Sequence, residues 1–252
     1  MISLDGQNIL VTGASRGIGA AIAGHILEAG GSVAAHYNSA LGRLAGLIEQ
    51  YGDERCRAIQ ADFREPGTID ACFAAAAEWS GGLDGLVNNA AIIDTVTIDE
   101  PIEDWRQAWA RTMAVNSQAV ADLCRHALLH FRARDGGMIV NIASRAAFRG
   151  DAPDSMHYAA SKGAVVALTR SIAKGYAKDG VCAYVIAPGW VETSRVMPKL
   201  EAPGNQALLA EVPMGRPAPP GEVANLVVFL LSGAARHASG ATFDINGASY
   251  FH

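Results

Sequence analysis

The stretch "NILVTGASRGIGAAIAGHILEAG", residues 8–30, runs from a short apolar segment through three glycines into a segment with helical apolar spacing. Gly13, Gly17 and Gly19 permit a tight turn, and they let backbone N–H groups approach an anion at the positive end of the following helix. Their spacing, G-x-x-x-G-x-G, differs from the commoner dinucleotide pattern G-x-G-x-x-G. An ordinary glycine-rich turn is the alternative, but the position between a strand and a helix favours a nucleotide-binding turn.

Strand-like and helix-like segments alternate along the whole chain. β-rich runs lie at 7–12, 31–37, 57–61, 83–88, 137–143, 181–187 and 241–245, and helical spacing occurs at 17–29, 40–51, 67–79, 102–133, 155–178 and 221–232. Several strands are almost continuously apolar, as expected for a parallel sheet covered by helices on both faces. The sequence therefore predicts an α/β fold, with residues 1–252 forming one domain.

Composition excludes several classes of protein. Half of the 252 residues are hydrophobic, and the formal net charge of −5 argues against a nucleic-acid-binding surface. The apolar run 226–231 is too short to span a membrane, and the first residues do not resemble a signal peptide. The four cysteines are scattered, which is typical of reduced thiols in a cytoplasmic protein. His126 and His130 are four residues apart without a third ligand, so we expect exposed helix histidines and no metal site.

The end of the second predicted strand bears on the choice of nucleotide. A carboxylate there would bind the ribose hydroxyls of NAD, whereas its absence leaves room for a 2′-phosphate. Residues 36–39 contain no acid, and Arg16 in the glycine turn carries a guanidinium that suits a phosphate. A solvated turn residue is the alternative role for Arg16. The sequence thus favours NADP(H), with NAD(H) possible.

A second motif lies in "HYAASKGAVVALTRSIA", residues 157–173, where Tyr158 and Lys162 share one face of a predicted helix. An ammonium beside a phenol favours the phenolate, so the pKa of the tyrosine would fall and it could exchange a proton with an alcohol or carbonyl oxygen. A packed tyrosine beside a solvated lysine is the simpler explanation when the pair is taken alone.

The chain as a whole resembles the classical short-chain dehydrogenase/reductase family, especially members similar to 3-oxoacyl-carrier-protein reductases. The matching motifs follow one another in family order: "TGASRGIG" (12–19), "NNAA" (88–91), Asn116, Ser144, "YAASK" (158–162) and "APGWVET" (187–193). The resemblance implies a Rossmann-type, doubly wound, seven-stranded sheet and hydride transfer between a nicotinamide cofactor and a carbonyl or alcohol. Ala91, Cys182 and Tyr184 depart from the residues that the family usually has, outside the catalytic set.

The resemblance also implies a role for each matching residue. Tyr158 would be the general acid or base, Lys162 would lower its pKa and bind the nicotinamide ribose, Ser144 would bind the substrate oxygen, and Asn116 would kink a helix and hold a water. Asp62 would hold the adenine amino group, and Thr193 would contact the nicotinamide amide. The full set expected to bind cofactor is Gly13, Ser15, Arg16, Gly17, Ile18, Gly19, Tyr37, Asn38, Ser39, Asp62, Phe63, Asn89, Ala90, Ala91, Tyr158, Lys162, Pro188, Gly189, Val191 and Thr193.

Three functions remain open at this point. The first is an NADP(H)-dependent reductase of a small ketone, sugar or keto acid, the second a reductase of 3-oxoacyl groups on an acyl carrier protein, and the third a nucleotide sensor without catalysis. Mixed charges in "RARDGG" (132–137) and "KGYAKDG" (174–180) favour a free substrate over an acidic carrier. Residues 193–213 are predicted to form a mobile lid, with a rigid surface loop as the alternative. Arg145, Arg149, Asp94 and Trp190 flank the predicted pocket, either in contact with substrate or in a solvated or packing role. The resemblance further implies a homotetramer.

Overall fold

Seven strands form one parallel sheet, in the order β3-β2-β1-β4-β5-β6-β7, within residues 2–252, which the computed structural model describes. The strands are β1 (Asn8–Val11), β2 (Ser32–Tyr37), β3 (Cys56–Gln60), β4 (Gly85–Asn88), β5 (Gly137–Ile142), β6 (Val181–Pro188) and β7 (Thr242–Ile245). β1 pairs in parallel with both β2 and β4, so the chain winds outward in two directions from β1. The doubly wound, seven-stranded parallel sheet predicted from the sequence is confirmed.

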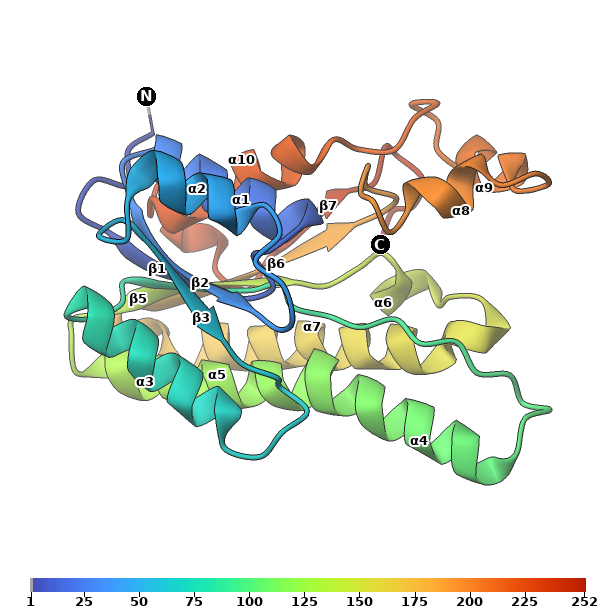
Figure 1. Ribbon diagram of the computed structural model, residues 1–252, viewed down its shortest axis with the longest axis horizontal. Coiled ribbons are helices and arrows are strands. Elements are labelled where there is room, and N and C mark those ends of the chain that lie inside the picture. The colour runs from blue at the N-terminus through green and yellow to red at the C-terminus, as the bar shows by residue number, and fades with distance from the viewer. Residues whose placement is uncertain (1) are drawn as a thin grey trace.

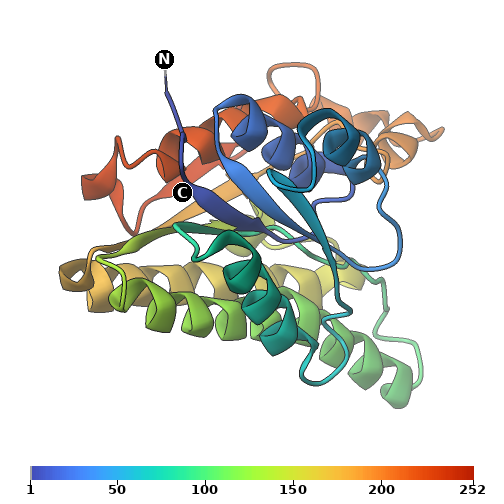
Figure 2. The ribbon, with the colours of Figure 1, turned by 60° about the vertical axis from the view of Figure 1, so that its left-hand side comes forward.

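Helices cover both faces of the sheet (Figure 1). One layer holds α1 (Gly17–Glu28), α2 (Leu44–Tyr51) and α10 (Pro220–Leu231), and the other holds α3 (Thr68–Ser80), α4 (Ile102–Met113), α5 (Ala119–Arg132) and α7 (Met156–Tyr176). Figure 2 shows the sheet between these layers. Each layer encloses its own apolar core, because the β-strand side chains point alternately to the two faces. Tyr184 is fully buried in the first core, and its hydroxyl donates to the carbonyl of Ala235 at 3.1 Å.

The predicted strands agree with the structure to within two residues at each end, but two predicted helices differ. The helix expected from residue 40 begins at Leu44. Residues 40–43 are not helical and instead cross the glycine turn, where the N–H of Arg43 donates to the carbonyl of Ser15 at 2.9 Å. A Cβ on Gly42 would lie 2.3 Å from that same carbonyl oxygen, so this crossing requires a glycine.

The stretch 102–133, predicted as one helix, is interrupted by a π-helical turn at Ala114–Gln118, between α4 and α5. The side-chain amide of Asn116 accepts a hydrogen bond from the N–H of Ile92 and donates to the carbonyl of the same residue, both at 2.9 Å. Widened turns of this kind often lie beside functional sites. The two hydrogen bonds of Asn116 therefore connect the π-helical turn between α4 and α5 with the loop that follows β4.

Three short helices lie beyond the carboxyl ends of the central strands: α6 (Ala146–Arg149), α8 (Met197–Glu201) and α9 (Gln206–Ala210). The predicted lid, 193–213, contains α8 and α9 (Figure 1). Its side chains Leu200 and Val212 are buried, so the segment packs onto the body of the protein. Within residues 2–252, no helix combines the length and hydrophobicity needed to cross a bilayer.

Candidate active site

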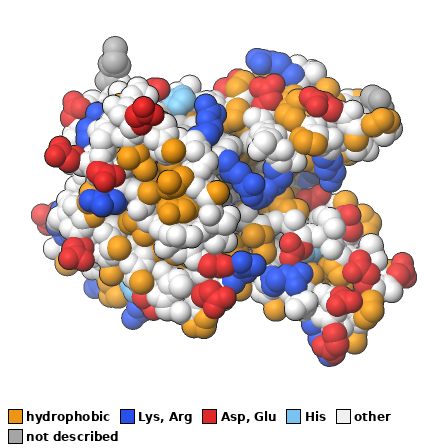
Figure 3. Space-filling view, in the orientation of Figure 1, with side chains coloured by type: hydrophobic (Ala, Val, Ile, Leu, Met, Phe, Trp, Pro, Cys, Tyr) orange, Lys and Arg blue, Asp and Glu red, His pale blue; other side chains and the backbone are white. Residues whose placement is uncertain are grey.

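A cleft of about 880 Å³ lies at the carboxyl edge of the sheet. It spans the point where β1 separates β2 from β4, the position at which doubly wound sheets bind ligands. Figure 3 shows the hollow, with Lys and Arg side chains gathered along it. Every residue predicted to bind cofactor lines the cleft except Tyr37, which packs against the apolar core on the α1 side of the sheet.

The glycine turn is shaped by close contacts with the loop after β4. Gly13 and Gly17 have φ values of 65° and 54°, a region that favours glycine. A Cβ on Gly19 would lie 2.2 Å from the carbonyl oxygen of Gly13 and 2.5 Å from Nδ2 of Asn89. That Asn89 amide donates to the carbonyls of Thr12 and Gly13 at 2.9 and 3.1 Å, which fixes the turn.

The glycine turn leaves the N-terminal end of α1 open toward the cleft. The residue before α1, Arg16, makes no side-chain capping bond, so the N-terminal N–H groups of the helix have no side-chain acceptor there. Uncapped N–H groups and the helix dipole together attract an anion. The turn therefore fits the diphosphate of a dinucleotide.

His36, which the sequence analysis did not select, forms part of the cleft wall on the β2 side. Its Nδ1 accepts from the N–H of Gly13 at 3.1 Å, and its Nε2 lies 3.0 Å from the carbonyl of Ala61, to which it donates. Its ring stacks on Phe63, with centroids 4.0 Å apart. Burial lowers the pKa of His36 to about 4, so the ring is neutral and its tautomer is set by these two bonds. Strand alternation explains why His36 faces the cleft and Tyr37 does not.

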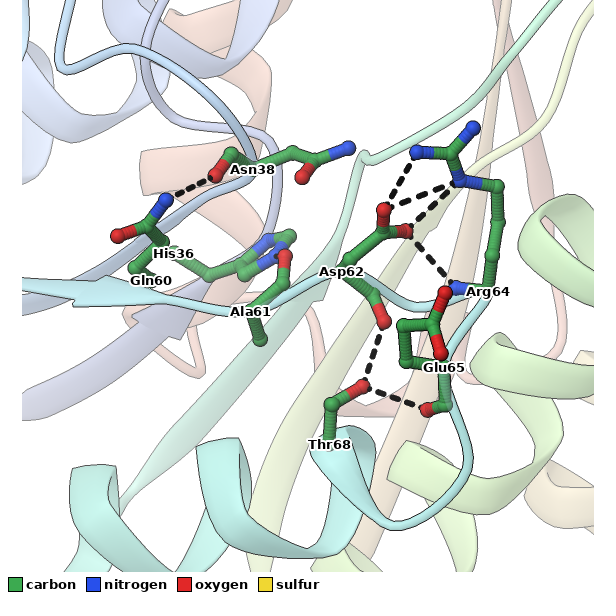
Figure 4. A network of polar contacts seen from close by, with 8 residues as sticks. All are labelled: His36, Asn38, Gln60, Ala61, Asp62, Arg64, Glu65 and Thr68. Carbon is green, nitrogen blue, oxygen red and sulfur yellow. Dashed lines mark hydrogen bonds and ion pairs between the residues drawn. The ribbon is translucent and has the colours of Figure 1, made fainter.

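Asp62 and Arg64 form an ion pair in the same region (Figure 4). The Arg64 guanidinium makes three hydrogen bonds to the two carboxylate oxygens, and the Arg64 backbone N–H adds a fourth at 3.0 Å. The pKa of Asp62 is lowered to about 2, chiefly by the hydrogen bond from Arg64, with Asn38 contributing. Asp62 thus lines the cleft as predicted, but its carboxylate is already engaged by a cation that the sequence analysis did not consider.

Ser144, Tyr158 and Lys162 all line the cleft near its centre. Ser144 follows β5, whereas Tyr158 and Lys162 lie one turn apart on α7. Lys162 is buried, and its ammonium donates to the carbonyl of Ile142 at 2.9 Å. Burial lowers the pKa of Lys162 to about 8, and the nearby positive charge of Arg195 acts in the same direction.

The pKa of Tyr158 is raised rather than lowered. Burial is the largest cause, and the negative charge of Asp151 adds to it, while Ser144 and Arg195 oppose the shift. The Lys162 ammonium lies 5.9 Å from the centre of the tyrosine ring and is directed to Ile142. Lys162 does not contribute to this shift, so the lowered pKa expected for Tyr158 is not found, and the phenol is protonated at neutral pH.

Asn116 lies behind the cleft wall instead of lining it. It is fully buried in the π turn, and its amide also lies 3.2 Å from the hydroxyl of Ser161, on the same helix as Tyr158 and Lys162. The side chain thus connects the loop after β4 with α7. This position agrees with the helix distortion expected at Asn116.

Beyond Ser144 the cleft is walled by Arg145, Arg149, Trp190, Arg195 and Lys199. The first three were predicted from the sequence to flank the pocket, whereas Arg195 and Lys199, which follow Thr193 in the predicted lid, were not. Arg195 reaches across the cleft to donate to the carbonyl of Ala91 at 3.3 Å. On the opposite side, Asp94 pairs with Arg111 at 3.0 Å.

The two histidines considered as metal ligands are partly buried, not exposed as expected. His126 pairs with Asp70 at 2.6 Å, and Nε2 of His130 accepts from the N–H of Leu83 at 2.9 Å. In the part of the chain that the structure describes, His, Cys, Asp and Glu side chains form no group of three or more that could hold a metal ion.

Comparison with known proteins places these features in a family. The sequence model of the family described as enoyl-(acyl carrier protein) reductase matches residues 13–248. The chain is 34% identical to the 3-oxoacyl-[acyl-carrier-protein] reductase FabG of Vibrio cholerae, over 99% of both chains. It is 35% identical to the 2-(R)-hydroxypropyl-CoM dehydrogenase of Xanthobacter autotrophicus, over 95% of this chain and 96% of that one.

A solved structure supports the same assignment. The crystal structure of a dehydrogenase/reductase from Sinorhizobium meliloti superimposes with a TM-score of 0.89 at 31% identity, covering 99% of this chain and 97% of the other. The fold, the glycine turn and the motif order agree with these relationships. The chain therefore belongs to the short-chain dehydrogenase/reductase family, and it is an oxidoreductase that acts on CH–OH and C=O groups.

Proposed function

We propose that the protein is an NADP(H)-dependent reductase of a free, small carbonyl compound, or in reverse a dehydrogenase of the corresponding secondary alcohol. The observation that carries this proposal is the convergence of Ser144, Tyr158 and Lys162 on a cleft that also contains an open glycine turn. A nucleotide sensor without catalysis would not need that trio. Nicotinamide, when bound, supplies or accepts the hydride.

In the reduction, the side chains of this chain would handle the charge that develops on the carbonyl oxygen. Tyr158, whose phenol is protonated at neutral pH, would donate its proton to that oxygen as the alcohol forms. The Ser144 hydroxyl would donate a hydrogen bond to the same oxygen. Lys162, held by the carbonyl of Ile142, would provide a fixed positive charge behind the tyrosine and bind ribose hydroxyls.

The preference for NADP(H) is supported by the charges beside the end of β2. Residues 36–39 contain no acid, Arg16 is exposed on one side, and Arg64 neutralises Asp62 on the other. A 2′-phosphate would thus meet guanidinium groups and no free carboxylate. Arg16→Ala should raise the Kd of NADPH by more than tenfold and leave the Kd of NADH within about twofold. Equal losses would mean that Arg16 only supports the turn.

Reduction of a 3-oxoacyl group on a carrier protein is the second candidate, because a relative with that name matches over nearly the whole chain. The two segments considered as carrier-docking sites precede β5 and β6, so they lie at the edge of the sheet opposite the cleft. Arg132 in the first segment is paired with Asp179 in the second at 3.1 Å. A carrier bound there would lie at the opposite edge of the sheet from the cleft of this chain, on a partly neutralised surface.

Two further properties belong to this proposal. We infer a homotetramer in which α4, α5 and α7 pair across an interface, since Ala160 and Ala164 form a small, exposed surface on α7 and Leu129 on α5 is also exposed. We also infer a cytoplasmic protein, because all four cysteines are buried free thiols.

The deciding experiment is an assay panel of ketones, sugars, oxo acids and a 3-oxoacyl carrier substrate, followed by nicotinamide absorbance with NADPH and NADH. We expect the highest kcat/KM for a free carbonyl compound with NADPH. A carrier substrate that is at least tenfold better, with a steep loss in salt, would assign the second function instead. No turnover of any member of the panel would refute both.

A further inference from the structure

A cluster of cations lies on the far side of Ser144 from the glycine turn. Arg145 and Lys199 flank the ring of Trp190, with Cζ and Nζ at 5.4 and 5.7 Å from its centroid. Arg149 lies one helical turn after Arg145 and also lines the cleft. The view in Figure 3 shows Lys and Arg side chains along the hollow, although the protein as a whole is acidic.

Arg145 is the most deeply buried member of this cluster, with only 4% of its surface exposed. Its guanidinium donates to the hydroxyl of Ser249 and to Oε2 of Glu211, the latter at 3.3 Å. Burial and then the charge of Arg149 lower the pKa of Arg145, whereas Glu211 and Asp151 act in the opposite direction. A buried charge requires an anion close by.

Glu211 satisfies this requirement incompletely. Its Oε2 accepts from Arg145 and also from Arg149, the latter at 3.1 Å, so two guanidinium groups share one oxygen. An arginine fork is best matched by two oxygens of one anion. In addition, Nε1 of Trp190 is buried without a hydrogen-bond acceptor among the described residues. Arg145, Arg149 and Trp190 thus carry more hydrogen-bond donors than the protein provides acceptors for on this side of the cleft.

The position of Glu211 matters as much as its contacts. It follows α9 in the predicted lid, 66 residues after Arg145 and 62 residues after Arg149 in the sequence. Its side chain is 42% exposed. The Glu211 carboxylate is thus open to solvent on one side, whereas Arg145 is buried and directly follows Ser144. An incoming anion could therefore replace Glu211 without any change in the body of the protein.

We propose that Arg145 and Arg149, beside Trp190, form a subsite for an anionic group of the substrate, a carboxylate or sulfonate, and that Glu211 occupies this subsite when no substrate is bound. The inference rests on the proposed function and names its substrate class: a carbonyl compound with an acid group a few bonds from the C=O. Because Arg145 directly follows Ser144, the acid and the carbonyl oxygen of one small molecule can reach both residues.

The test uses the full chain, with 2-, 3- and 4-oxo acids such as pyruvate, acetoacetate and levulinate, each compared with its methyl ester. Binding is measured by calorimetry in the presence of NADP⁺, and turnover separately with NADPH. Arg149→Met should weaken binding of the preferred acid by about tenfold or more, as expected for a lost charge-assisted bond, and leave its ester within about twofold. Arg170→Met, which removes an exposed arginine elsewhere on α7, is the matched control.

Glu211→Gln provides a test of opposite sign. Removing the internal carboxylate should tighten binding of the acid severalfold and leave the ester unchanged. Glu201→Gln removes the same charge from an exposed position on α8 and should change neither. If Glu211 only fastens the lid, its loss would weaken the acid and the ester alike, and that result would overturn the proposal.

The remaining outcomes separate the two levels of inference. Acids that bind with the expected response to both variants but are never reduced would refute the proposed function and leave the subsite standing. Esters that are reduced as well as acids, with neither variant changing their ratio, would leave the reductase standing and overturn the subsite.

Discussion

Lys162→Met should change the pH dependence of stability in a protein that carries no nucleotide. The pKa of Lys162 falls from 10.5 to about 8 on folding, because the side chain is buried. Each unit of pKa corresponds to about 1.4 kcal/mol, so keeping this ammonium charged at neutral pH costs the folded state about 3 kcal/mol relative to an exposed lysine.

The sign follows from proton binding in the two states. Between pH 8 and 10.5 the unfolded chain holds a proton on Lys162 that the folded protein has released, so the free energy of unfolding of the wild type rises with pH in this window. Below pH 8 the full cost is present. Methionine has no proton to release. The free energy of unfolding of the wild type minus that of the variant should therefore increase by about 1.4 kcal/mol per pH unit within the window. The hydrogen bond to Ile142 shifts this difference by a constant and leaves its slope unchanged.

Urea unfolding at fixed protein concentration, at half-unit steps from pH 7 to 9.5, measures this slope. Lys178→Met, at an exposed position after α7, is the matched control and should give a profile parallel to that of the wild type. Parallel profiles for wild type and Lys162→Met would refute the reasoning, because they would mean that Lys162 keeps its ordinary pKa in the folded protein.

Three further predictions concern catalysis, the glycine turn and assembly. Tyr158→Phe should lower kcat by at least about 10²-fold while the Kd of NADPH measured by fluorescence stays unchanged, and retention of more than about a tenth of kcat would remove Tyr158 from the acid/base role. Gly19→Ala should abolish NADPH binding and lower the free energy of unfolding in urea by more than about 2 kcal/mol, because its Cβ meets the Gly13 carbonyl oxygen. The control Gly24→Ala, whose Cβ has only Leu47 at 3.8 Å, should stabilise α1 by about 0.5–1 kcal/mol. Similar behaviour of the two variants would contradict this prediction. Light scattering should give the mass of a tetramer, and a monomer at all concentrations would exclude the inferred assembly.

The sequence predicted the strands and most helices because their signals are local. Apolar runs and period-3.6 patterns depend on neighbours within one or two turns. The late start of α2 and the π turn at Asn116 could not be predicted in this way, since each depends on a contact with a distant segment: Ser15 for the first, Ile92 for the second. The doubly wound arrangement of the seven strands was predicted only through the family resemblance, and their order comes from the structure.

The site shows the same division between local and long-range information. The glycine turn and the Tyr158–Lys162 pair could be read directly, because glycine conformation and helical spacing fix them. The burial that raises the pKa of Tyr158, and the direction of the Lys162 ammonium toward Ile142, depend on how α7 packs against β5. Likewise, Arg145 and Glu211 are far apart in sequence and meet only when the segment after α9 folds back over the cleft.

The charges of the cleft connect these observations. Eight cationic side chains line it, Arg16, Arg64, Arg111, Arg145, Arg149, Lys162, Arg195 and Lys199, against three acids, Asp62, Asp94 and Asp151, of which the first two are already paired. Burial is the larger cause of the lowered pKa of both Arg195 and Lys162, and repulsion between cations adds to it: Arg16 acts on Arg195, and Arg195 acts on Lys162. Anions placed between them, the phosphates of a nucleotide or the acid group of a substrate, would relieve this repulsion and raise the pKa of Lys162 again. By linkage, ligand binding near pH 8 should then be accompanied by partial proton uptake at Lys162, since burial, the larger cause of its lowered pKa, remains.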